Sequence, residues 1–403
     1  MGRDSGGSRQ WAPYLLVLIA IPLLLSCLPV LAVSADAGPW PLAAALAGQP
    51  RTTSTPAPST GIWTVATGTI VTSSTDTPVS QATQAVRTST PAPSTTPTTM
   101  PATSPSAGIV WSSRASGTSN RLESIFCFAT GTCLAAGWGG TVLRSVDGGR
   151  TWQSRASGIG LNLASVACNG RTCVAVGDGG ILVVSADGGN TWHVRSSDTN
   201  EVLSGVTCRT VRICLAVGWG GVVTISEDAG ATWSATFVNQ ASEQNGIGEL
   251  WNVTCLTSNA CLTGSVDGDI LTTTDGGHSW TETYSGGVAN DMFGPGIACS
   301  TSRACLAVGA GGIVLVSSDG GARWAPISSG SNIDLWSIAC PTSSICIGVG
   351  RSGAILASAD PSAAWRASPV SVDADLWGIA CTSSNTCLAA GDDGIVFVAS
   401  LRR

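Results

Sequence analysis

The chain has 403 residues, of which 43% are hydrophobic, so it can bury a sizeable core. Its 50 glycines and its charged content of only 11% favour many short strands and tight turns, which is typical of an all-β fold. The chain has 19 arginines and no lysine, and its formal net charge is -6. This balance excludes a basic surface for nucleic acid, so we expect no nucleic-acid partner.

The first 37 residues have the pattern of an export signal. Arg3 and Arg9 precede an uncharged, largely apolar run at residues 14–33, which corresponds to the charged and apolar regions of such a signal. We therefore expect the rest of the chain to be exported and to be extracellular or at the cell surface.

Three fates of this segment remain open. Ala35 and Ala37 offer a cleavage site, whereas residues 14–33 are also long enough to stay as a membrane anchor. A third interpretation takes residues 24–27 as a lipidation signal at Cys27. The chain would contact the membrane through this segment if it is not removed.

Residues 38–108 read as a disordered linker. Between residues 51 and 107, 42 of 57 residues are Ser, Thr, Pro or Ala, and the hexapeptide TPAPST occurs twice. Such a segment has too few large apolar groups to offset the entropy lost on ordering. We expect a stalk between the export segment and the domain that follows.

Residues 109–403 contain an internal repeat. The segment at residues 163–197 recurs with drift from Leu122 onward, giving seven copies at spacings that suit a four-stranded propeller blade. Within one copy the strands read SVAC, CVAVG, ILVVS and TWHVR, each bounded by turn residues. The third strand is apolar on both faces, which favours a sheet packed between two neighbouring sheets.

The last copy ends after its third strand. Residues 109–118 (IVWSSRASGT) match the fourth strand of the first copy (TWQSRASGIG), so we expect them to complete the last blade. Closure of the ring would remove exposed sheet edges. The sequence thus predicts an all-β, seven-bladed β-propeller with four-stranded blades, closed by an N-terminal strand.

Each repeat carries one short-range pair of cysteines, and only Cys27 lies outside the pairs. The pairs are Cys127 and Cys133, Cys168 and Cys173, Cys208 and Cys214, Cys255 and Cys261, Cys299 and Cys305, Cys340 and Cys346, and Cys381 and Cys387. Each pair spans a hairpin between the first and second strands, at bridging distance. We expect one disulfide per blade rather than a metal site, because the chain has no C-x-x-C spacing and only two histidines.

Six repeats contain a turn of the form S/T-x-D-x-G-x-x-W, as in SADGGNTW, degraded in the last of them to SADPSAAW. This turn resembles the Asp-box, or BNR repeat, of sialidases and related propellers. Its aspartates can accept turn amide hydrogen bonds, and its tryptophans are expected to begin the fourth strand. The resemblance implies a structural role for Asp147, Asp187, Asp228, Asp275, Asp319 and Asp360.

The Asp-box together with a preceding AVG-x-G-G-I-L segment resembles the photosystem II assembly and stability factor propellers over about residues 109–403. That resemblance implies a non-enzymatic seven-bladed propeller that binds a reaction-centre precursor protein. The paired cysteines and the Thr/Pro-rich stalk depart from the photosynthetic pattern. The resemblance therefore supports a propeller domain of this family more strongly than it supports a role in photosynthesis.

No catalytic constellation emerges from the sequence, and we expect no cofactor or metal. A sialidase would need a tyrosine nucleophile beside an arginine triad, and the propeller contains only Tyr284. A glycosidase with two carboxylates remains an alternative, because several aspartates fall between second and third strands. These are Asp178, Asp267, Asp269, Asp392 and Asp393, and loop aspartates of this kind also form turns.

Strand order predicts that recognition loops gather at the end of the propeller opposite the disulfides and Asp-boxes. Two insertions, at residues 239–250 and 286–296, are expected to open there. The candidate binding residues at that end are Arg121, Trp138, Trp219, Trp336, Arg351 and Trp377. Tryptophan and arginine are enriched at binding hot spots, although tryptophans in these places can also fill gaps between blades.

Together these features predict an exported, non-enzymatic propeller that binds or assembles an envelope or membrane protein. The alternative is a carbohydrate-binding or glycoside-hydrolase propeller at the cell surface.

Overall fold

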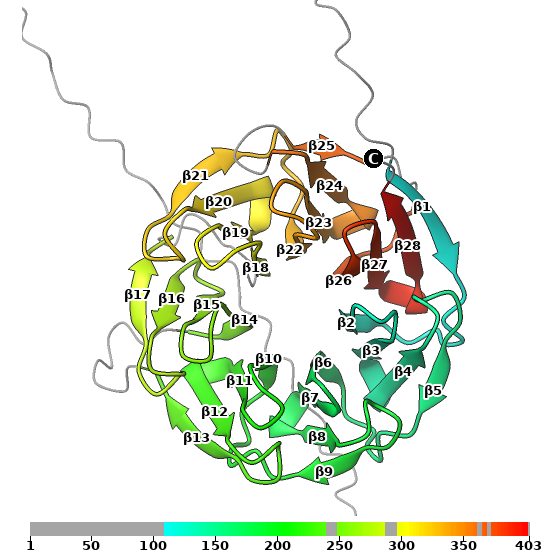
Figure 1. The fold of residues 1–403 in the computed structure, drawn as a ribbon, viewed down its shortest axis with the longest axis vertical. Coiled ribbons are helices and arrows are strands. Elements are labelled where there is room, and N and C mark those ends of the chain that lie inside the picture. The colour runs from blue at the N-terminus through cyan, green and yellow to red at the C-terminus, as the bar shows by residue number, and fades with distance from the viewer. Residues whose placement is uncertain (1–108, 239–247, 287–295, 361–364, 369–371, 402–403) are drawn as a thin grey trace, which may run out of the picture. The chain divides into compact units, whose positions relative to one another are not determined.

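The structure is a computed structural model, and the residues that it describes fall within one compact unit, 96–403. The described ranges are 109–238, 248–286, 296–360, 365–368 and 372–401. They form seven four-stranded antiparallel sheets arranged around a common axis (Figure 1). The predicted seven-bladed β-propeller is confirmed. The expected signal or anchor (1–37), the linker (38–108) and most of both insertions lie outside the described residues.

Each blade runs from an inner strand beside the axis to an outer strand at the rim (Figure 1). The first blade contains β2 (Leu122–Cys127), β3 (Cys133–Gly137), β4 (Thr141–Ser145) and β5 (Gln153–Arg155). The second contains β6 (Leu163–Asn169), β7 (Thr172–Gly177), β8 (Leu182–Ser185) and β9 (His193–Arg195). The third contains β10 (Leu203–Cys208), β11 (Cys214–Gly218), β12 (Val222–Ser226) and β13 (Ser234–Phe237).

The remaining four blades repeat this order. The fourth contains β14 (Leu250–Cys255), β15 (Cys261–Ser265), β16 (Ile270–Thr273) and β17 (Thr281–Tyr284). The fifth contains β18 (Gly296–Cys299), β19 (Cys305–Val308), β20 (Ile313–Ser317) and β21 (Ala325–Ser328). The sixth contains β22 (Leu335–Ala339), β23 (Cys346–Gly350), β24 (Ile355–Ser358) and β25 (Arg366–Ala367). The seventh contains β26 (Leu376–Ser383), β27 (Thr386–Gly391), β28 (Val396–Leu401) and β1 (Ile109–Arg114).

The hydrophobic core lies between neighbouring blades. All residues of β7 and β8 in the second blade are buried. Val174 and Leu182 pack in a cluster shared with the third blade, whereas Ala175 and Val183 pack in a cluster shared with the first. Side chains alternate between the two faces of a strand, so these middle strands must be apolar at every position. This packing explains the continuous apolar runs seen in the sequence.

The seventh blade joins the two ends of the propeller domain. Its outer strand β1 pairs antiparallel with β28, from Ile109 opposite Leu401 to Arg114 opposite Val396. Ile109 and Trp111 also pack against the apolar cluster between the sixth and seventh blades. The strand at the start of the domain therefore covers what would otherwise be an open edge of β28.

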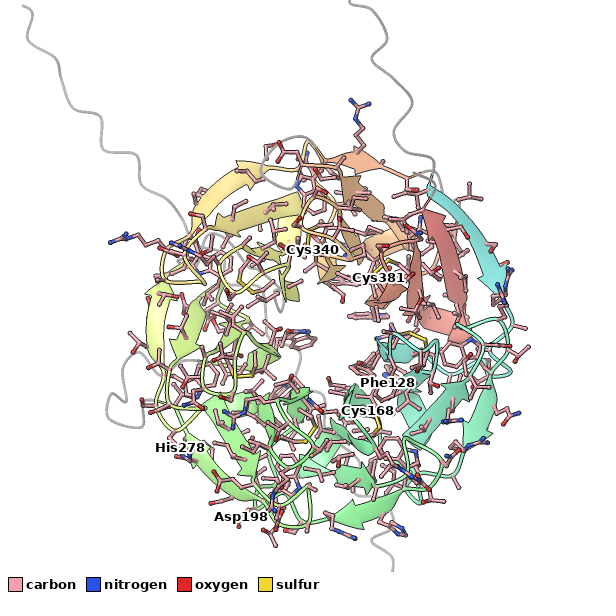
Figure 2. All side chains as sticks on the ribbon, in the orientation of Figure 1. Phe128, Cys168, Asp198, His278, Cys340 and Cys381 are labelled. Atoms are coloured by element: carbon pink, nitrogen blue, oxygen red, sulfur yellow. A yellow bond between two sulfur atoms is a disulfide. The ribbon has the colours of Figure 1, made fainter. Side chains whose placement is uncertain are left out.

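Each blade carries a disulfide between its first and second strands. In the first blade Cys127 lies directly opposite Cys133 in the β2–β3 register. All seven predicted pairs are bridged, with Cα atoms 3.9 to 4.1 Å apart. Figure 2 labels Cys168, Cys340 and Cys381, which belong to three of these bridges. Because each bridge closes a short hairpin within one sheet, it stabilises a single blade and does not link blades.

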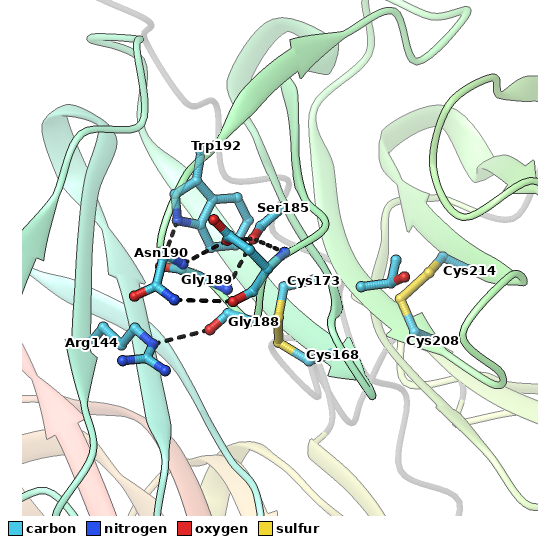
Figure 3. Close-up of a disulfide and its surroundings, with 12 residues drawn as sticks. Arg144, Cys168, Cys173, Ser185, Gly188, Gly189, Asn190, Trp192, Cys208 and Cys214 are labelled. Atoms are coloured by element: carbon cyan, nitrogen blue, oxygen red, sulfur yellow. Dashed lines mark hydrogen bonds between the residues drawn. A yellow bond between two sulfur atoms is a disulfide. The ribbon is translucent and has the colours of Figure 1, made fainter.

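The Asp-box of the second blade shows how the repeated turn is held. Asp187 Oδ1 accepts hydrogen bonds from the amides of Asn190 and Thr191, both at 3.0 Å, and Oδ2 accepts one from the Thr191 hydroxyl at 2.7 Å. The Ser185 hydroxyl donates to Asp187 Oδ1 at 2.8 Å and accepts from the amide of Gly189 at 2.9 Å (Figure 3). Asp187 therefore stabilises the turn, as the resemblance of this segment to the Asp-box implies.

The box also contacts the preceding blade. Gly189 has φ 83°, and a Cβ atom there would lie 2.5 Å from the Leu134 side chain in the first blade. Arg144, also in the first blade, donates from Nε to the carbonyl oxygen of Gly188 at 3.0 Å (Figure 3). Glycine is therefore needed both for the left-handed backbone and for the close approach of neighbouring blades.

The fourth strands begin one residue later than the sequence predicts. Trp192 precedes β9 and remains part of the turn, where its indole Nε1 donates to the carbonyl oxygen of Gly189 at 3.2 Å. Trp152 likewise precedes β5 and bonds to Gly149. The tryptophan closes the turn that precedes the strand, and the strand pairing starts after it.

Hydrogen bonding lowers the pKa of the Asp228 carboxyl in the third blade. The hydroxyl and the amide of Thr232 lower the pKa of Asp228 to about 2. An aspartate in an unfolded chain has a pKa of about 3.9, so the folded state holds its charge more strongly. The contribution to stability is present above about pH 4 and is lost as the pH falls through the folded pKa.

We predict that peptide mapping without reduction will recover each of the seven cysteine pairs linked within its own blade. Replacing both Cys168 and Cys173 by serine should lower the free energy of unfolding by roughly 2 kcal/mol, because the crosslinked loop is short. Several free cysteines, or linkages between blades, would contradict the assignment.

We also predict that Asp187→Ala lowers the free energy of unfolding in urea by roughly 1 to 3 kcal/mol, because turn amides lose their acceptor. Glu201→Ala, which removes a carboxylate from a connection between blades, serves as the control and should change stability by less than about 0.5 kcal/mol. Equal stability of Asp187→Ala and the parent protein would show that the box is not a folding device.

Candidate functional site

The antiparallel strand order places different connections at the two ends of the propeller. The end with the disulfides and Asp-boxes is called the box end here, and the end with second-to-third and blade-to-blade connections is called the loop end. In six blades the second-to-third connection contains a one-turn 3-10 helix. These are η1 (Trp138–Gly140), η2 (Asp178–Gly180), η3 (Trp219–Gly221), η4 (Ala310–Gly312), η5 (Arg351–Gly353) and η6 (Asp392–Gly394).

Backbone geometry fixes the loop end of the first blade. A Cβ atom on Gly137 would lie 1.9 Å from the carbonyl oxygen of Arg121, so only glycine allows the two segments to meet. The amide of Trp138 then donates to that same carbonyl oxygen at 2.9 Å. The close approach holds Arg121, before the inner strand, next to Trp138, after the second strand.

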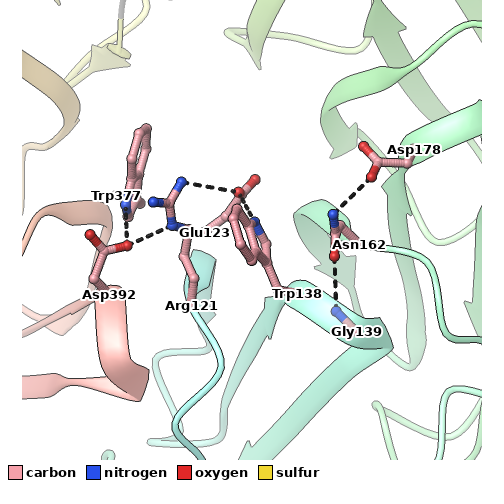
Figure 4. Close-up of polar contacts among 8 residues, drawn as sticks. All are labelled: Arg121, Glu123, Trp138, Gly139, Asn162, Asp178, Trp377 and Asp392. Atoms are coloured by element: carbon pink, nitrogen blue, oxygen red, sulfur yellow. Dashed lines mark hydrogen bonds and ion pairs between the residues drawn. The ribbon is translucent and has the colours of Figure 1, made fainter. Parts of the chain in front are cut away.

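Arg121 lies between two tryptophan rings (Figure 4). Its guanidinium carbon is 4.5 Å from the ring centroid of Trp138 and 4.5 Å from that of Trp377. Trp377 in turn stacks on Trp336, with centroids 4.1 Å apart and planes inclined by 11°. We call these four residues the stacked ladder, and it joins the first, seventh and sixth blades at the loop end.

Carboxylates hold the polar edges of the stacked ladder (Figure 4). Asp392 Oδ1 accepts from Arg121 Nε at 2.5 Å and from Trp377 Nε1 at 3.0 Å. Glu123 Oε1 accepts from Trp138 Nε1 at 2.6 Å and lies 4.0 Å from the Arg121 guanidinium. The rings and the guanidinium are therefore fixed by paired charges as well as by stacking.

Glu123 also belongs to this site, although the sequence analysis did not identify it as a candidate. Burial raises the pKa of Glu123, opposed by the hydrogen bond from Trp138 and the charge of Arg121, while Asp178 and Asp392 add to the rise. It is the second residue of β2, the place taken by Trp336 in β22 and Trp377 in β26. Alignment of the repeats at that position could have revealed it.

Asparagine and aspartate side chains also connect neighbouring blades at the loop end. Asn162 Oδ1 accepts from the amide of Gly139 in the preceding blade at 3.0 Å, and its Nδ2 donates to Asp178 at 2.9 Å (Figure 4). Asp334 accepts from Gly311, and Asp375 from Ser352, each at 2.8 Å. Each of these residues immediately precedes an inner strand and caps the turn of the blade before it.

A family model described as Photosynthesis system II assembly factor YCF48 matches residues 111–399. The chain belongs to this family. YCF48 from Cyanidioschyzon merolae is 19% identical with a TM-score of 0.60, over 72% of this chain and 98% of that one. A structure of YCF48 bound to D1 peptide is also 19% identical, with a TM-score of 0.59 over 72% of this chain and 96% of that one.

Other propellers share the architecture. The GH74 xyloglucanase from Xanthomonas campestris is 14% identical with a TM-score of 0.57, over 71% of this chain and 53% of that one. At such identities the solved structures show a common fold only. A comparison with curated protein sequences gives no match. The family membership therefore rests on the match to residues 111–399, and it confirms the resemblance seen in the sequence.

The structure brings together four of the six candidate binding residues, namely those of the stacked ladder. Arg351 instead pairs with Asp334 at 3.3 Å, with 65% of its side chain exposed. Trp219 lies in η3 of the third blade and is 40% exposed. The ladder tryptophans thus have a structural role in stacking between blades. Trp219 is exposed at the surface, where a partner can contact it.

Charge is distributed unequally between the two ends. The described connections of the loop end carry eleven carboxylates and two arginines, Arg121 and Arg351. The carboxylates are Asp178, Asp198, Glu201, Glu249, Asp267, Asp269, Asp334, Asp373, Asp375, Asp392 and Asp393. The described connections of the box end carry seven carboxylates and six arginines. They are Asp147, Asp187, Glu227, Asp228, Asp275, Asp319 and Asp360, with Arg150, Arg171, Arg209, Arg212, Arg303 and Arg323. Negative charge is therefore concentrated at the loop end.

Several candidate catalytic carboxylates have structural partners. Asp392 bonds to the ladder and Asp178 to Asn162, as described above, and Asp269 accepts from the Ser285 hydroxyl and the Gly286 amide, both at 3.2 Å. Asp393 occupies a left-handed turn position with φ 54°. These contacts fit the turn-forming alternative for loop aspartates.

Among the described residues, no group of three or more His, Cys, Asp or Glu side chains is arranged to hold a metal ion. In the same part of the chain, no helix is long and apolar enough to cross a membrane. Residues 14–33, the candidate anchor, lie outside this part.

We predict that Arg121→Ala lowers the free energy of unfolding by about 1 to 3 kcal/mol, because two ring contacts and a charged hydrogen bond are lost. Arg351→Ala, which removes one exposed ion pair at the same end, should cost about 0 to 1 kcal/mol. Tryptophan fluorescence should change in Arg121→Ala only, as the faces of Trp138 and Trp377 become solvated. Similar effects of the two substitutions would contradict the stacked arrangement.

Proposed function

We propose that this chain is an exported, non-enzymatic assembly propeller that binds an envelope or membrane protein through its loop end. The observation that carries this proposal is Trp138, which is 43% exposed although its ring is fixed by Arg121 and Glu123. A large, rigid side chain at a surface loses little entropy on binding, and tryptophan is enriched among residues that dominate interface energies.

Relatives support a protein ligand. The chain shares its family with YCF48, and one YCF48 structure contains a bound D1 peptide. The loop end here offers exposed aromatic side chains on short, hydrogen-bonded turns, which is the arrangement that a preformed protein-binding surface needs. We extend binding of a membrane-protein segment to this chain on that basis.

Two features support export. The first 37 residues have the charged and apolar regions of an export signal. Seven disulfides, one in every blade, are also typical of oxidising compartments outside the cytoplasm. An extracellular or cell-surface location, tethered by residues 14–33 if these are retained, fits both.

A cell-surface glycosidase is the second candidate, and Glu123 is the observation that favours it. A glycosidase acid needs a raised pKa, and burial raises the pKa of Glu123. Glu123 however accepts a hydrogen bond from Trp138 and lies beside Arg121, and its neighbour Asp392 is bonded to that arginine. These contacts support a role in positioning the stacked ladder.

Site-specific photocrosslinking of the full chain in its native cells tests the proposal. A benzophenone amino acid at Trp219, exposed at the loop end, should crosslink to one envelope or membrane protein. The same group at Val211, 52% exposed at the box end, is the matched control and should not. Adding Trp138→Ala should reduce the crosslink at position 219 about tenfold, as expected for loss of a binding hot spot.

Equal crosslinking from positions 219 and 211 would overturn the protein-binding proposal. Hydrolysis of a xyloglucan by the purified chain, abolished by Glu123→Gln, would replace it with the glycosidase candidate. No hydrolysis is expected, since the loop end is proposed to recognise its partner without chemistry.

A further inference from the structure

We propose that the loop end binds a cationic, arginine-containing segment of its protein partner. This inference rests on the proposed protein-binding function and specifies the chemistry of the partner. It is carried by three separate observations: an excess of carboxylates at one end, exposed apolar side chains at that same end, and an internal arginine already bound by both kinds of group.

Charge complementarity selects the sign of the partner. The loop-end connections hold eleven carboxylates against two arginines, whereas those of the box end hold seven against six. Both loop-end arginines are already paired, Arg121 with Asp392 and Arg351 with Asp334. The field at this end therefore attracts cations and repels an acidic segment.

Exposed apolar groups lie among these carboxylates. Of the nine large hydrophobic residues that are exposed in the described structure, four belong to loop-end connections: Trp138, Leu161, Trp219 and Ile333. Ile333 is next to Asp334 and Leu161 is next to Asn162 in the sequence, so exposed apolar residues have polar neighbours in these two connections. Such a mixed surface suits a peptide whose side chains are long, apolar along the stem and positively charged at the tip.

The stacked ladder shows which groups bind an arginine side chain at this end. Arg121 places its guanidinium between Trp138 and Trp377 while Asp392 accepts its Nε proton. This internal contact has the components that an arginine from a partner would need, namely an aromatic face and a carboxylate. Trp219 offers an indole at this end that is 40% exposed. Arginine should be preferred to lysine, because the planar guanidinium stacks on indole whereas an ammonium does not.

Fluorescence anisotropy with the full chain tests the inference. The probes are labelled twelve-residue peptides in which glycine alternates with arginine, lysine or glutamate. The arginine peptide should bind most tightly and the glutamate peptide should show no binding. Raising the sodium chloride concentration from 50 to 300 mM should lower the affinity for the arginine peptide by about tenfold, because exposed charges are screened.

Charge-removing variants then locate the site. Asp375→Asn combined with Asp393→Asn removes two loop-end charges. At position 375 the new amide keeps a side-chain acceptor for the Ser352 amide, as Asn162 does for Gly139, and at position 393 asparagine tolerates the left-handed backbone. This double substitution should lower the affinity for the arginine peptide by about threefold or more.

The matched control removes two charges from the box end. It combines Glu227→Gln with Asp319→Asn, and the side-chain oxygen at position 319 can still accept from the Arg323 amide after the substitution. This control should leave binding of the arginine peptide unchanged, because its charges lie at the opposite end of the propeller.

Aromatic contact is tested by Trp219→Ala against Val211→Ala, an exposed apolar residue at the box end. The first should abolish the preference for arginine over lysine and the second should preserve it. A single cooperative thermal unfolding transition above the assay temperature confirms that each variant is folded. Equal effects of the loop-end and box-end variants, or binding of the glutamate peptide as tightly as the arginine peptide, would overturn the cationic partner. Loop-end crosslinking to a partner could still hold in that case, so the two proposals fail separately.

Discussion

Burial of both faces of the middle strands is the constraint on which the rest of the structure depends. Val174 and Ala175, adjacent in β7, pack against different neighbouring blades. A single blade would leave one of these faces in water, so no blade can bury its apolar surface alone. The ring follows from this requirement, and β1 pairs with β28 in its seventh blade.

The same ring separates two kinds of end. At the box end the polar groups are largely used within the fold: Asp187 is bonded to its own turn, and Gly189 packs against Leu134 of the preceding blade. At the loop end Asx side chains also hold the backbone turns, and the indoles of Trp138 and Trp219 are exposed. Under the proposed function, folding and recognition use opposite ends of the propeller, so side chains at the loop end can differ without changing the turns at the box end.

The seam between the seventh and first blades shows how this variation works. Asn162, Asp334 and Asp375 cap the turn of the preceding blade with a side-chain oxygen. Arg121 occupies the corresponding position in the first blade and cannot accept such a bond, so it reaches Asp392 with its guanidinium instead. The substitution replaces a backbone cap by a charged pair and brings two tryptophan rings onto the arginine.

The sequence by itself predicted the seven blades from the number of repeat copies. It also predicted the disulfide pairs and the turn-forming role of box aspartates such as Asp187, because these depend on contacts within one repeat. It also placed Arg121, Trp138, Trp336 and Trp377 at one end. Only the tertiary structure decided that these four stack and that Glu123 and Asp392 hold them, since they come from three different blades. The start of the fourth strand, one residue after each box tryptophan, was likewise decided by how the indole bonds to the turn.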